Sequence, residues 1–450
     1  MFTSILFLIL ALLLISFVPE TVTPWIDSKW IAFTVSILLF ICLLGFICLQ
    51  HRLLKKFFKR QPSAWLIIVN MELLTYLIIY QYVLDAGRIF TTFPSLENLQ
   101  ILNATWELAL YLIGLGITYS LNYLYSYPYG NYEARYYYAI RQLRLLIPFI
   151  FPFFFLTLFL DIFNLTVGPY VSLQAFEWIS LIFSILLVIS LLIFLPYFIQ
   201  KIWKCHPLPS GELKDRLTKI CQRAHFKHAG MKTWSIMHDQ LTAGIIGVIP
   251  CFRYVMFTDR LLQELPPESI EAILVHEIGH NARRHLLIYP FILAGMVVSA
   301  SLILYLFSDS LMNLLEQTDP KHPSKFWSLF NPLIFFTLYA LIVIIYFRFV
   351  FGYFSRIFER QADLHVFDVG MPPQHMIEAL KAVAYTSGGY DTPNWHHYSI
   401  KERVEFLQAC ITDPRLIQRH HYKAKISVFI YFVAFILAIF FLIYNTFTFQ

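Results

Sequence analysis

The segment PPESIEAILVHEIGH, residues 266–280, decides the predicted fold and chemistry. Its two prolines and Glu268 are typical of a first helical turn, which tolerates proline and favours a carboxylate. A helix here places His276 and His280 one turn apart on one face, so both imidazoles can reach one zinc ion at about 2.0–2.1 Å. Glu277, about 100° further round, can take a proton from a zinc-activated water. The segment therefore predicts a hydrolytic zinc site on a helix.

Three further observations bear on this motif. Gly279 costs helix stability, about 1 kcal/mol relative to alanine, and a close approach of backbone or substrate to the metal would explain it. In a chain with 15 histidines the motif can also arise by chance. Arg283 and Leu286 stand where a three-histidine site of the metzincin type has glycine and histidine, so that site is excluded. A distant glutamate is the remaining common third ligand.

The composition indicates a membrane protein. Of 450 residues, 58% are hydrophobic and 14% charged, far from soluble domains. Nine apolar segments, of about 17–25 residues in most cases, can cross a hydrocarbon core of about 30 Å. We expect spans at residues 5–18, 30–49, 64–84, 106–124, 145–163, 178–199, 286–307, 332–350 and 426–444. The first is short and could be a signal anchor.

Basic residues predict the orientation, because they accumulate on the cytoplasmic side. The loops after even-numbered spans contain Arg52, Lys55, Lys56, Lys59, Arg60, Arg135, Arg141, Arg144, Lys201 and Lys204, and those after odd-numbered spans only Lys29, Arg88, Lys321 and Lys325. Both long polar segments should therefore face the cytoplasm, across a bacterial inner membrane or an ER-type membrane, with the C terminus outside. The net charge of +6 follows from this asymmetry, and no further basic patch indicates a nucleic-acid partner.

This pattern divides the chain into five parts. We expect an N-terminal membrane domain of six spans (1–200), the first half of an α+β zincin-like catalytic domain (201–285), a two-span hairpin (286–350), the second half of the catalytic domain (351–424) and a last span (425–450). In the first half, strands at 233–237, 242–249 and 254–258 should form a meander. The hairpin returns the chain to its starting side, so the two halves can share one site.

The second half begins with SRIFERQAD, residues 355–363. Arg356, Glu359 and Asp363 share one helix face by their spacing. Glu359 is the predicted third zinc ligand. The alternative is a solvated charged face, which would not explain why paired spans return two polar segments to one side of the membrane.

Three blocks resemble the integral-membrane zinc peptidases that include the CAAX prenyl endopeptidase and the HtpX heat-shock protease. They are LPPE (265–268) leading into HEIGH (276–280), Ser355-Arg356 with Glu359 and Ala362-Asp363, and HYSIKERV (397–404), which is similar to that family's His-Pro-Ser-Leu-x-x-Arg-Ile element. The resemblance covers about residues 201–407. The number of N-terminal spans and His285 are more like the CAAX endopeptidase. Thr242 and Tyr398 replace the usual Asn and Pro, and the last span is extra, so the substrate class stays open.

The resemblance and the helical geometry imply roles for particular residues. One zinc ion per chain would be held by His276, His280 and Glu359, with water in the fourth position and Glu277 as base and later acid. Asp363 would orient a ligand imidazole, most simply that of His280. Its alternative is a simple ion pair with Arg356 or Arg360.

The remaining site residues follow from the same resemblance. His397 and Arg403 are candidates to stabilise the oxyanion, with an ordinary helix-surface pair as the alternative. Arg356 and His285 are expected beside the ligands. Thr242, Ala243 and Gly244 begin the strand expected to bind an extended peptide, unless it is an ordinary sheet edge.

Together these inferences predict a multispan zinc endopeptidase. Its partners would be peptide or membrane-protein substrates and the lipid bilayer, and it would hydrolyse peptide bonds at the cytoplasmic face in protein quality control. Processing of a lipidated peptide, as by a CAAX endopeptidase, is the alternative with the same chemistry. A catalytically silent membrane scaffold or transporter with a structural zinc is the alternative from another class.

Overall fold

The computed structural model describes residues 2–16, 25–57, 65–92, 99–126, 132–234, 241–316, 325–387, 389–392 and 397–448. The chain forms two compact units. Unit 1 comprises Met1–Leu191 and Leu314–Leu338, and unit 2 comprises Leu192–Asn313 and Tyr339–Gln450. All predicted site residues lie in unit 2, so the site is built within one unit.

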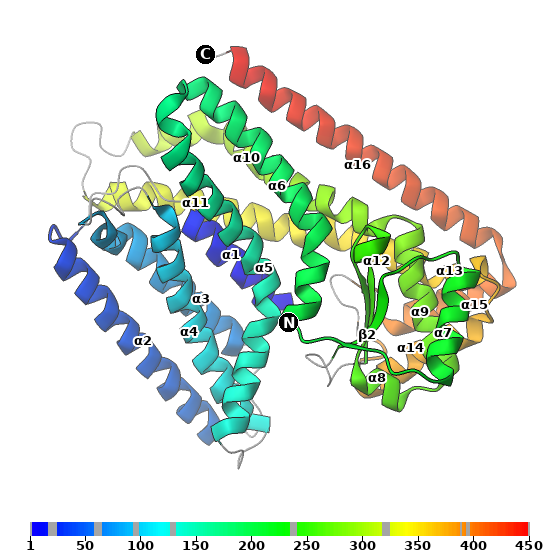
Figure 1. Ribbon diagram of the computed structural model, residues 1–450. Helices are drawn as coiled ribbons and strands as arrows, with labels where there is room; N and C mark the ends of the chain where they lie inside the picture. The colour runs from blue at the N-terminus through cyan, green and yellow to red at the C-terminus, as the bar shows by residue number, and fades with distance from the viewer. Residues whose placement is uncertain are drawn as a thin grey trace. The chain divides into compact units, whose positions relative to one another are not determined.

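Unit 1 is helical (Figure 1). Its elements are α1 (Phe2–Ser16), α2 (Lys29–Phe57), α3 (Trp65–Ile78) with the π-helix η1 (Ile79–Val83), η2 (Ala86–Thr92), α4 (Gln100–Ser126), α5 (Tyr132–Thr166), η3 (Gly168–Tyr170) and most of α6 (Leu173–Ile202). Some of the polar side chains buried between these helices pair with one another. The Glu107 carboxylate accepts hydrogen bonds from Gln81 and Asn103, each 2.7 Å long, as a carboxyl group enclosed by apolar helices requires.

Among the described helices, seven are long and apolar enough to cross a membrane. The number is eight if the two bent parts of α6 together count as one span. The bend of 51° lies between Trp178–Leu191 and Ile193–Ile202. Pro196 explains it, because its ring clashes with the carbonyl four residues earlier and it has no N–H to donate. The first predicted span corresponds to α1, which has only 15 residues. The multispan fold is therefore confirmed, with seven or eight spans among the described residues instead of nine.

Unit 2 combines a small sheet with helices. Its elements are β1 (His206–Pro207), α7 (Glu212–Arg223), β2 (Gly230–Thr233), β3 (Ala243–Ile246), η5 (Pro250–Phe252), β4 (Tyr254–Phe257), α8 (Asp259–Glu264), α9 (Pro267–Ala282), most of α10 (His285–Glu316), the end of α11 (Lys325–Tyr346), the π-helix η6 (Phe347–Phe351), α12 (Gly352–Asp363), α13 (His365–Asp368), α14 (Pro373–Ser387), α15 (Ile400–Thr412) and α16 (Arg415–Thr448).

The sheet has the strand order β1-β2-β4-β3. β2 pairs with β4 in parallel and β3 pairs with β4 antiparallel, so the predicted meander is wrong. All four residues of β4 are buried, whereas β3 alternates buried and half-buried residues. The more apolar strand therefore takes the inner position and β3 the edge. The strand predicted at 233–237 is β2, which starts earlier, and residues 235–237 lie outside the described chain.

Helix α9 is the centre of unit 2. Its buried residues Ile270, Leu274 and Ile278 belong to the core, and β3, α7, α12, α13 and α14 pack around it (Figure 1). A Cβ on Gly279 would lie 3.0 Å from both Cα and O of Ala362 in α12. The glycine therefore permits a close approach of the α12 backbone.

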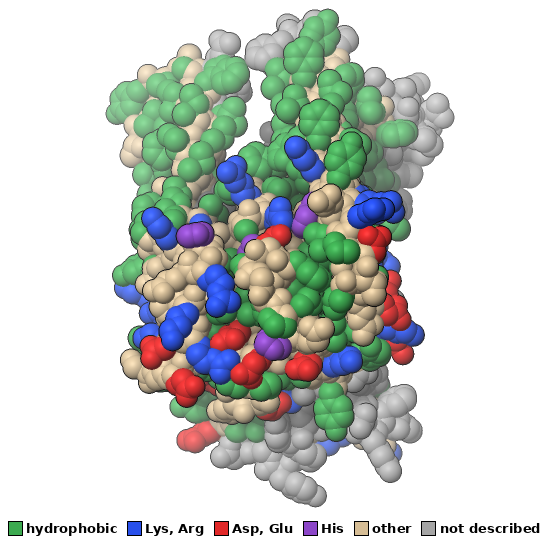
Figure 2. Space-filling model, turned by 90° about the vertical axis from the view of Figure 1, so that its right-hand side faces the viewer, with side chains coloured by type: hydrophobic (Ala, Val, Ile, Leu, Met, Phe, Trp, Pro, Cys, Tyr) green, Lys and Arg blue, Asp and Glu red, His purple; other side chains and the backbone are tan. Residues whose placement is uncertain are grey.

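The surface of the spans agrees with a lipid environment. Figure 2 shows one face on which hydrophobic side chains fill most of the upper part, charged side chains of both signs lie scattered below them, and several Lys and Arg side chains lie where the two parts meet. In α16, Phe429, Ile430 and Leu437 are 68, 61 and 62% exposed. Water would not stabilise such a helix, so this surface faces hydrocarbon.

Candidate metal centre

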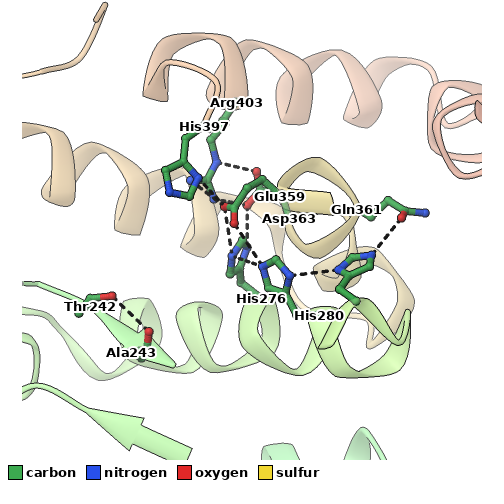
Figure 3. Close-up of polar contacts among 10 residues, drawn as sticks. Thr242, Ala243, His276, His280, Glu359, Gln361, Asp363, His397 and Arg403 are labelled. Atoms are coloured by element: carbon green, nitrogen blue, oxygen red, sulfur yellow. Dashed lines mark hydrogen bonds and ion pairs between the residues drawn. The ribbon is translucent and has the colours of Figure 1, made fainter. Parts of the chain in front are cut away.

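Three side chains from α9 and α12 converge on one point (Figure 3). Nε2 of His276 lies 3.2 Å from Nε2 of His280, and Glu359 places Oε1 3.4 Å from His280 Nε2 and Oε2 3.6 Å from His276 Nε2. One ligand atom of each residue lies within 4.8 Å of the others. Two imidazoles and a carboxylate are the donors of catalytic zinc sites that keep the fourth position open. The donor set therefore fits one zinc ion, as predicted.

Asp363 orients one of these ligands. Its Oδ1 lies 2.9 Å from Nδ1 of His276, and Arg403 donates to both carboxylate oxygens at 2.6 and 2.8 Å. A proton on Nδ1 shared with the carboxylate leaves Nε2 free to bind metal. The predicted partner, His280, was wrong, because the side of the His276 ring away from the ligand cluster faces Asp363. The partner cation is Arg403, from α15, and not Arg356 or Arg360.

His280 is held by a different chain of contacts. Its Nδ1 lies 3.0 Å from Nδ1 of His285, whose Nε2 lies 3.1 Å from Oε1 of Gln361. The Gln361 amide nitrogen lies 3.1 Å from Nδ1 of His421 in α16. If His280 binds metal through Nε2, it donates from Nδ1, and each later group donates to the next. The ring of His280 is thereby fixed from three helices.

The start of α15 positions His397 and Arg403. Ser399 is the N-cap, its hydroxyl accepts from the Glu402 N–H at 3.2 Å, and the Glu402 carboxylate accepts from the Ser399 N–H at 2.9 Å. This capping box fixes where the helix begins. Nδ1 of His397 and Nη1 of Arg403 lie 3.4 and 3.5 Å from Oε2 of Glu359. The block HYSIKERV thus meets the ligand cluster through both residues of its motif.

Tyr398 stands where the resembling family has proline. The Arg360 guanidinium lies over its ring, 3.7 Å from the centroid, and over the Phe406 ring at 4.5 Å. A cation between two aromatic faces is a favourable arrangement. The substitution thus adds a contact between α12 and the segment that carries His397.

Glu277 lies between the ligands and the sheet. Burial raises the pKa of its carboxyl group, while His276, His280 and a hydrogen bond from the Ile245 backbone oppose that shift. A carboxylate with a raised pKa beside a metal is suited to accept a proton. The backbone contact also ties the predicted base to β3.

The outer edge of β3 is open in the described sheet, since β3 pairs only with β4 there. The Thr258 N–H donates to the Thr242 carbonyl, so this pair is hydrogen-bonded, and the bonded pairs then alternate along the strands. Main-chain groups of Ala243 and Ile245 therefore point away from β4, and those of Gly244 point toward it. The Thr242 hydroxyl donates to the Ala243 carbonyl at 3.2 Å (Figure 3).

Two histidines and a glutamate that could hold one metal ion, in a multispan helical protein, are the donor set and setting typical of membrane zinc metallopeptidases. Residues 207–419 match the sequence model of Peptidase family M48. The CAAX prenyl protease 1 homolog of Oryza sativa subsp. japonica is 24% identical over 248 residues, which are 54% of this chain and 56% of the relative. The chain thus spans little more than half of that relative.

A solved structure has a similar fold. The crystal structure of S. mikatae Ste24p matches with a TM-score of 0.53 and 20% identity, over 85% of this chain and all of that chain. This likeness shows a common fold for the membrane helices and the small mixed sheet.

Several predicted residues thus lie together, and others were missed. The zinc ligands, Asp363, His285, His397 and Arg403 form one connected cluster, and Arg356 is half-buried on the same helix as Glu359. Gln361 and His421 were not predicted. Gln361 lies off the Glu359 face of its helix, and the sequence around His421 contains no motif, so no local pattern could have identified them.

Proposed function

We propose that the protein is an endopeptidase that cleaves extended segments of membrane or membrane-associated proteins, bound as an added strand beside β3. The observation that carries this proposal is the position of Glu277, which touches the open edge at Ile245 and adjoins two zinc ligands. A substrate strand paired with Ala243 would pass the metal by main-chain hydrogen bonds. Thr242 and Gly244 would shape that edge.

The chain's own groups would then carry the reaction. Zinc, when bound, would polarise the scissile carbonyl. Glu277 accepts a proton from the attacking water and delivers it to the leaving amine. His397, whose side chain is 37% exposed, would donate to the oxyanion, because Arg403 is already engaged by Asp363 and Glu359. Arg403 would hold the two carboxylates in place, and Arg356 and His285 would support the ligands.

The proposal keeps the predicted five-part organisation, in which residues 201–285 and 351–424 form the catalytic domain at the cytoplasmic face. Turnover of membrane proteins in quality control needs only an edge strand that pairs with any extended segment. The name of the rice relative favours a second candidate, the processing of a lipid-modified C-terminal peptide. Cleavage of an unmodified single-span membrane protein, compared with cleavage of a prenylated peptide, separates the two.

Replacement of the base tests the chemistry. Glu277→Gln should lower kcat by about 10²–10⁴-fold while zinc stoichiometry stays at one, because the ligands remain. Glu268→Gln is the matched control, since Glu268 lies on the surface of the same helix and pairs with Arg216. Unchanged hydrolysis by the Glu277 variant would show that Glu277 is not the base. A zinc-loaded native chain that hydrolyses no peptide would indicate that the zinc is structural and the chain a scaffold or transporter.

Orientation can be tested with a native thiol. Cys251 is exposed on η5 in the proposed catalytic domain. A membrane-impermeant maleimide should label it only when the cytoplasmic face is accessible. A reporter fused after Gln450 should be accessible from the opposite side, and labelling of Cys251 from that side would contradict the proposed orientation.

A further inference from the structure

Unit 1 contains a cavity of about 570 Å³ that is separate from the metal centre. Residues from the end of α2, the end of α4 and the start of α5 line it. These three helices are candidate membrane spans, over Lys29–Lys56, Gln100–Leu124 and Glu133–Tyr170. The cavity therefore lies at the end of each span, at the level where a bilayer carries its headgroups.

The charge of the cavity has one sign. Arg52, Lys55, Lys56 and Arg135 line it, and no aspartate or glutamate is among its lining residues. Three of these cations follow one another on one face of α2 at spacings of three and four, and like charges at such spacings destabilise a helix. The orientation of a membrane protein explains why basic residues lie on one side of the membrane. It does not explain why those of α2 line the same cavity as Arg135 of α5. A bound anion would relieve this repulsion.

The cavity also has an unused donor and an apolar wall. Nε of Arg135 is buried and has no hydrogen-bond partner in the described part of the chain. A buried N–H without an acceptor is unfavourable, and a phosphate oxygen is a suitable acceptor. Leu121 and Leu124 of α4 form the apolar part of the lining. A ligand that carries a phosphate and an acyl chain would satisfy both parts.

We propose that this cavity binds the phosphate headgroup of an anionic glycerophospholipid, held by Arg52, Lys55, Lys56 and Arg135, with its acyl region against Leu121 and Leu124. Basic pockets between membrane helices recognise anionic headgroups in this manner. A free phosphate would use the same cations but would leave the leucines without a partner. The N-terminal spans thereby acquire a binding function that the peptidase reaction does not require.

Binding of a fluorescent short-chain phosphatidylglycerol to the full chain in neutral detergent tests the proposal, with phosphatidylcholine and inorganic phosphate as comparison probes. The double variant Arg52→Gln with Arg135→Gln should weaken phosphatidylglycerol binding about thirtyfold. The matched control is Arg141→Gln with Arg144→Gln, which removes equal charge from α5 outside the cavity lining and should change affinity less than threefold. Arg52→Lys with Arg135→Lys keeps the charge and should retain most of the binding, so a folding defect is distinguished from lost recognition.

Three results would overturn the proposal. The first is equal affinity for phosphatidylcholine and phosphatidylglycerol. The second is an equal effect of the cavity variant and its control. The third is binding of inorganic phosphate as tight as that of the lipid, which would make the site a simple anion site. Strong preference for phosphatidylglycerol, lost only in the cavity variant, supports it.

Discussion

Replacement of Gly279 by alanine is a test in which helix propensity and packing predict opposite results. Alanine in the middle of a helix is favoured over glycine by about 1 kcal/mol. The added Cβ, however, would lie 2.8 Å from Cβ of His365 and 3.0 Å from the Ala362 backbone. Ordinary carbon contacts are about 3.5–4.0 Å, so α12 must move by about 0.5–1 Å. Overpacking of this kind costs about 1–3 kcal/mol, so after the gain in helix propensity we expect Gly279→Ala to destabilise the fold by up to about 2 kcal/mol.

The same displacement acts on the metal centre. Glu359 lies on α12, whereas His276 and His280 lie on α9 with Gly279. Zinc sites tolerate ligand distances within about 0.2 Å, which is less than the expected movement. The zinc affinity of the Gly279→Ala variant should therefore fall by about 10–100-fold, as for loss of a group that supports a ligand.

Competition with a chromophoric chelator measures the zinc affinity, and thermal unfolding with and without zinc measures stability. Gly45→Ala in α2 is the control, because nothing lies within 4 Å of the added Cβ there. This control should keep its zinc affinity and lose no stability. A Gly279→Ala protein that binds zinc normally and unfolds at a higher temperature would refute the packing argument.

Three other substitutions test the surroundings of the site. Asp363→Asn should lower zinc affinity about 10–100-fold and stability by about 3 kcal/mol, because it leaves the buried Arg403 poorly paired. The control Asp368→Asn, in a more exposed ion pair with Arg283, should change stability by less than about 1 kcal/mol. Chelator competition measures the zinc affinity and unfolding measures the stability, and equal effects of the two substitutions would contradict the role of Asp363. Gln361→Leu should reduce zinc affinity about tenfold, whereas Gln361→Glu should retain it, because a glutamate side chain still accepts a hydrogen bond from His285. A similar loss of zinc affinity in both variants would argue against the chain of contacts from His280 through His285 to Gln361. Thr242→Val should lower KM about two- to tenfold by freeing the Ala243 carbonyl for a substrate strand, and an unchanged KM in peptide hydrolysis would place the substrate elsewhere.

The sequence predicted the parts of the site that depend on helical periodicity. His276, His280 and Glu359 follow from spacing along single helices, and their convergence follows from the return of the chain through two spans. The partner of Asp363 depends on which imidazole nitrogen faces which helix, and spacing contains no information about that rotation. Gln361 illustrates the same limit, since its contact with His285 depends on the angle between α10 and α12.

The sheet was predicted less well than the helices. The strand propensities at 242–249 and 254–258 identify β3 and β4. They do not predict the strand order, in which β4 lies between β2 and β3. That order is set by burial, because the four buried side chains of β4 require neighbours on both sides. Strand order is a property of the assembled core, which a local pattern does not encode.

The separation of the zinc ligands has a consequence for biosynthesis. α9 leaves the ribosome before α10 and α11, and α12 follows them. The histidines therefore exist for some time without the glutamate, and the complete ligand set forms only when the hairpin has entered the bilayer and returned. Metal loading is thereby linked to completed insertion, so a chain stalled during synthesis or left outside the membrane carries no complete metal centre.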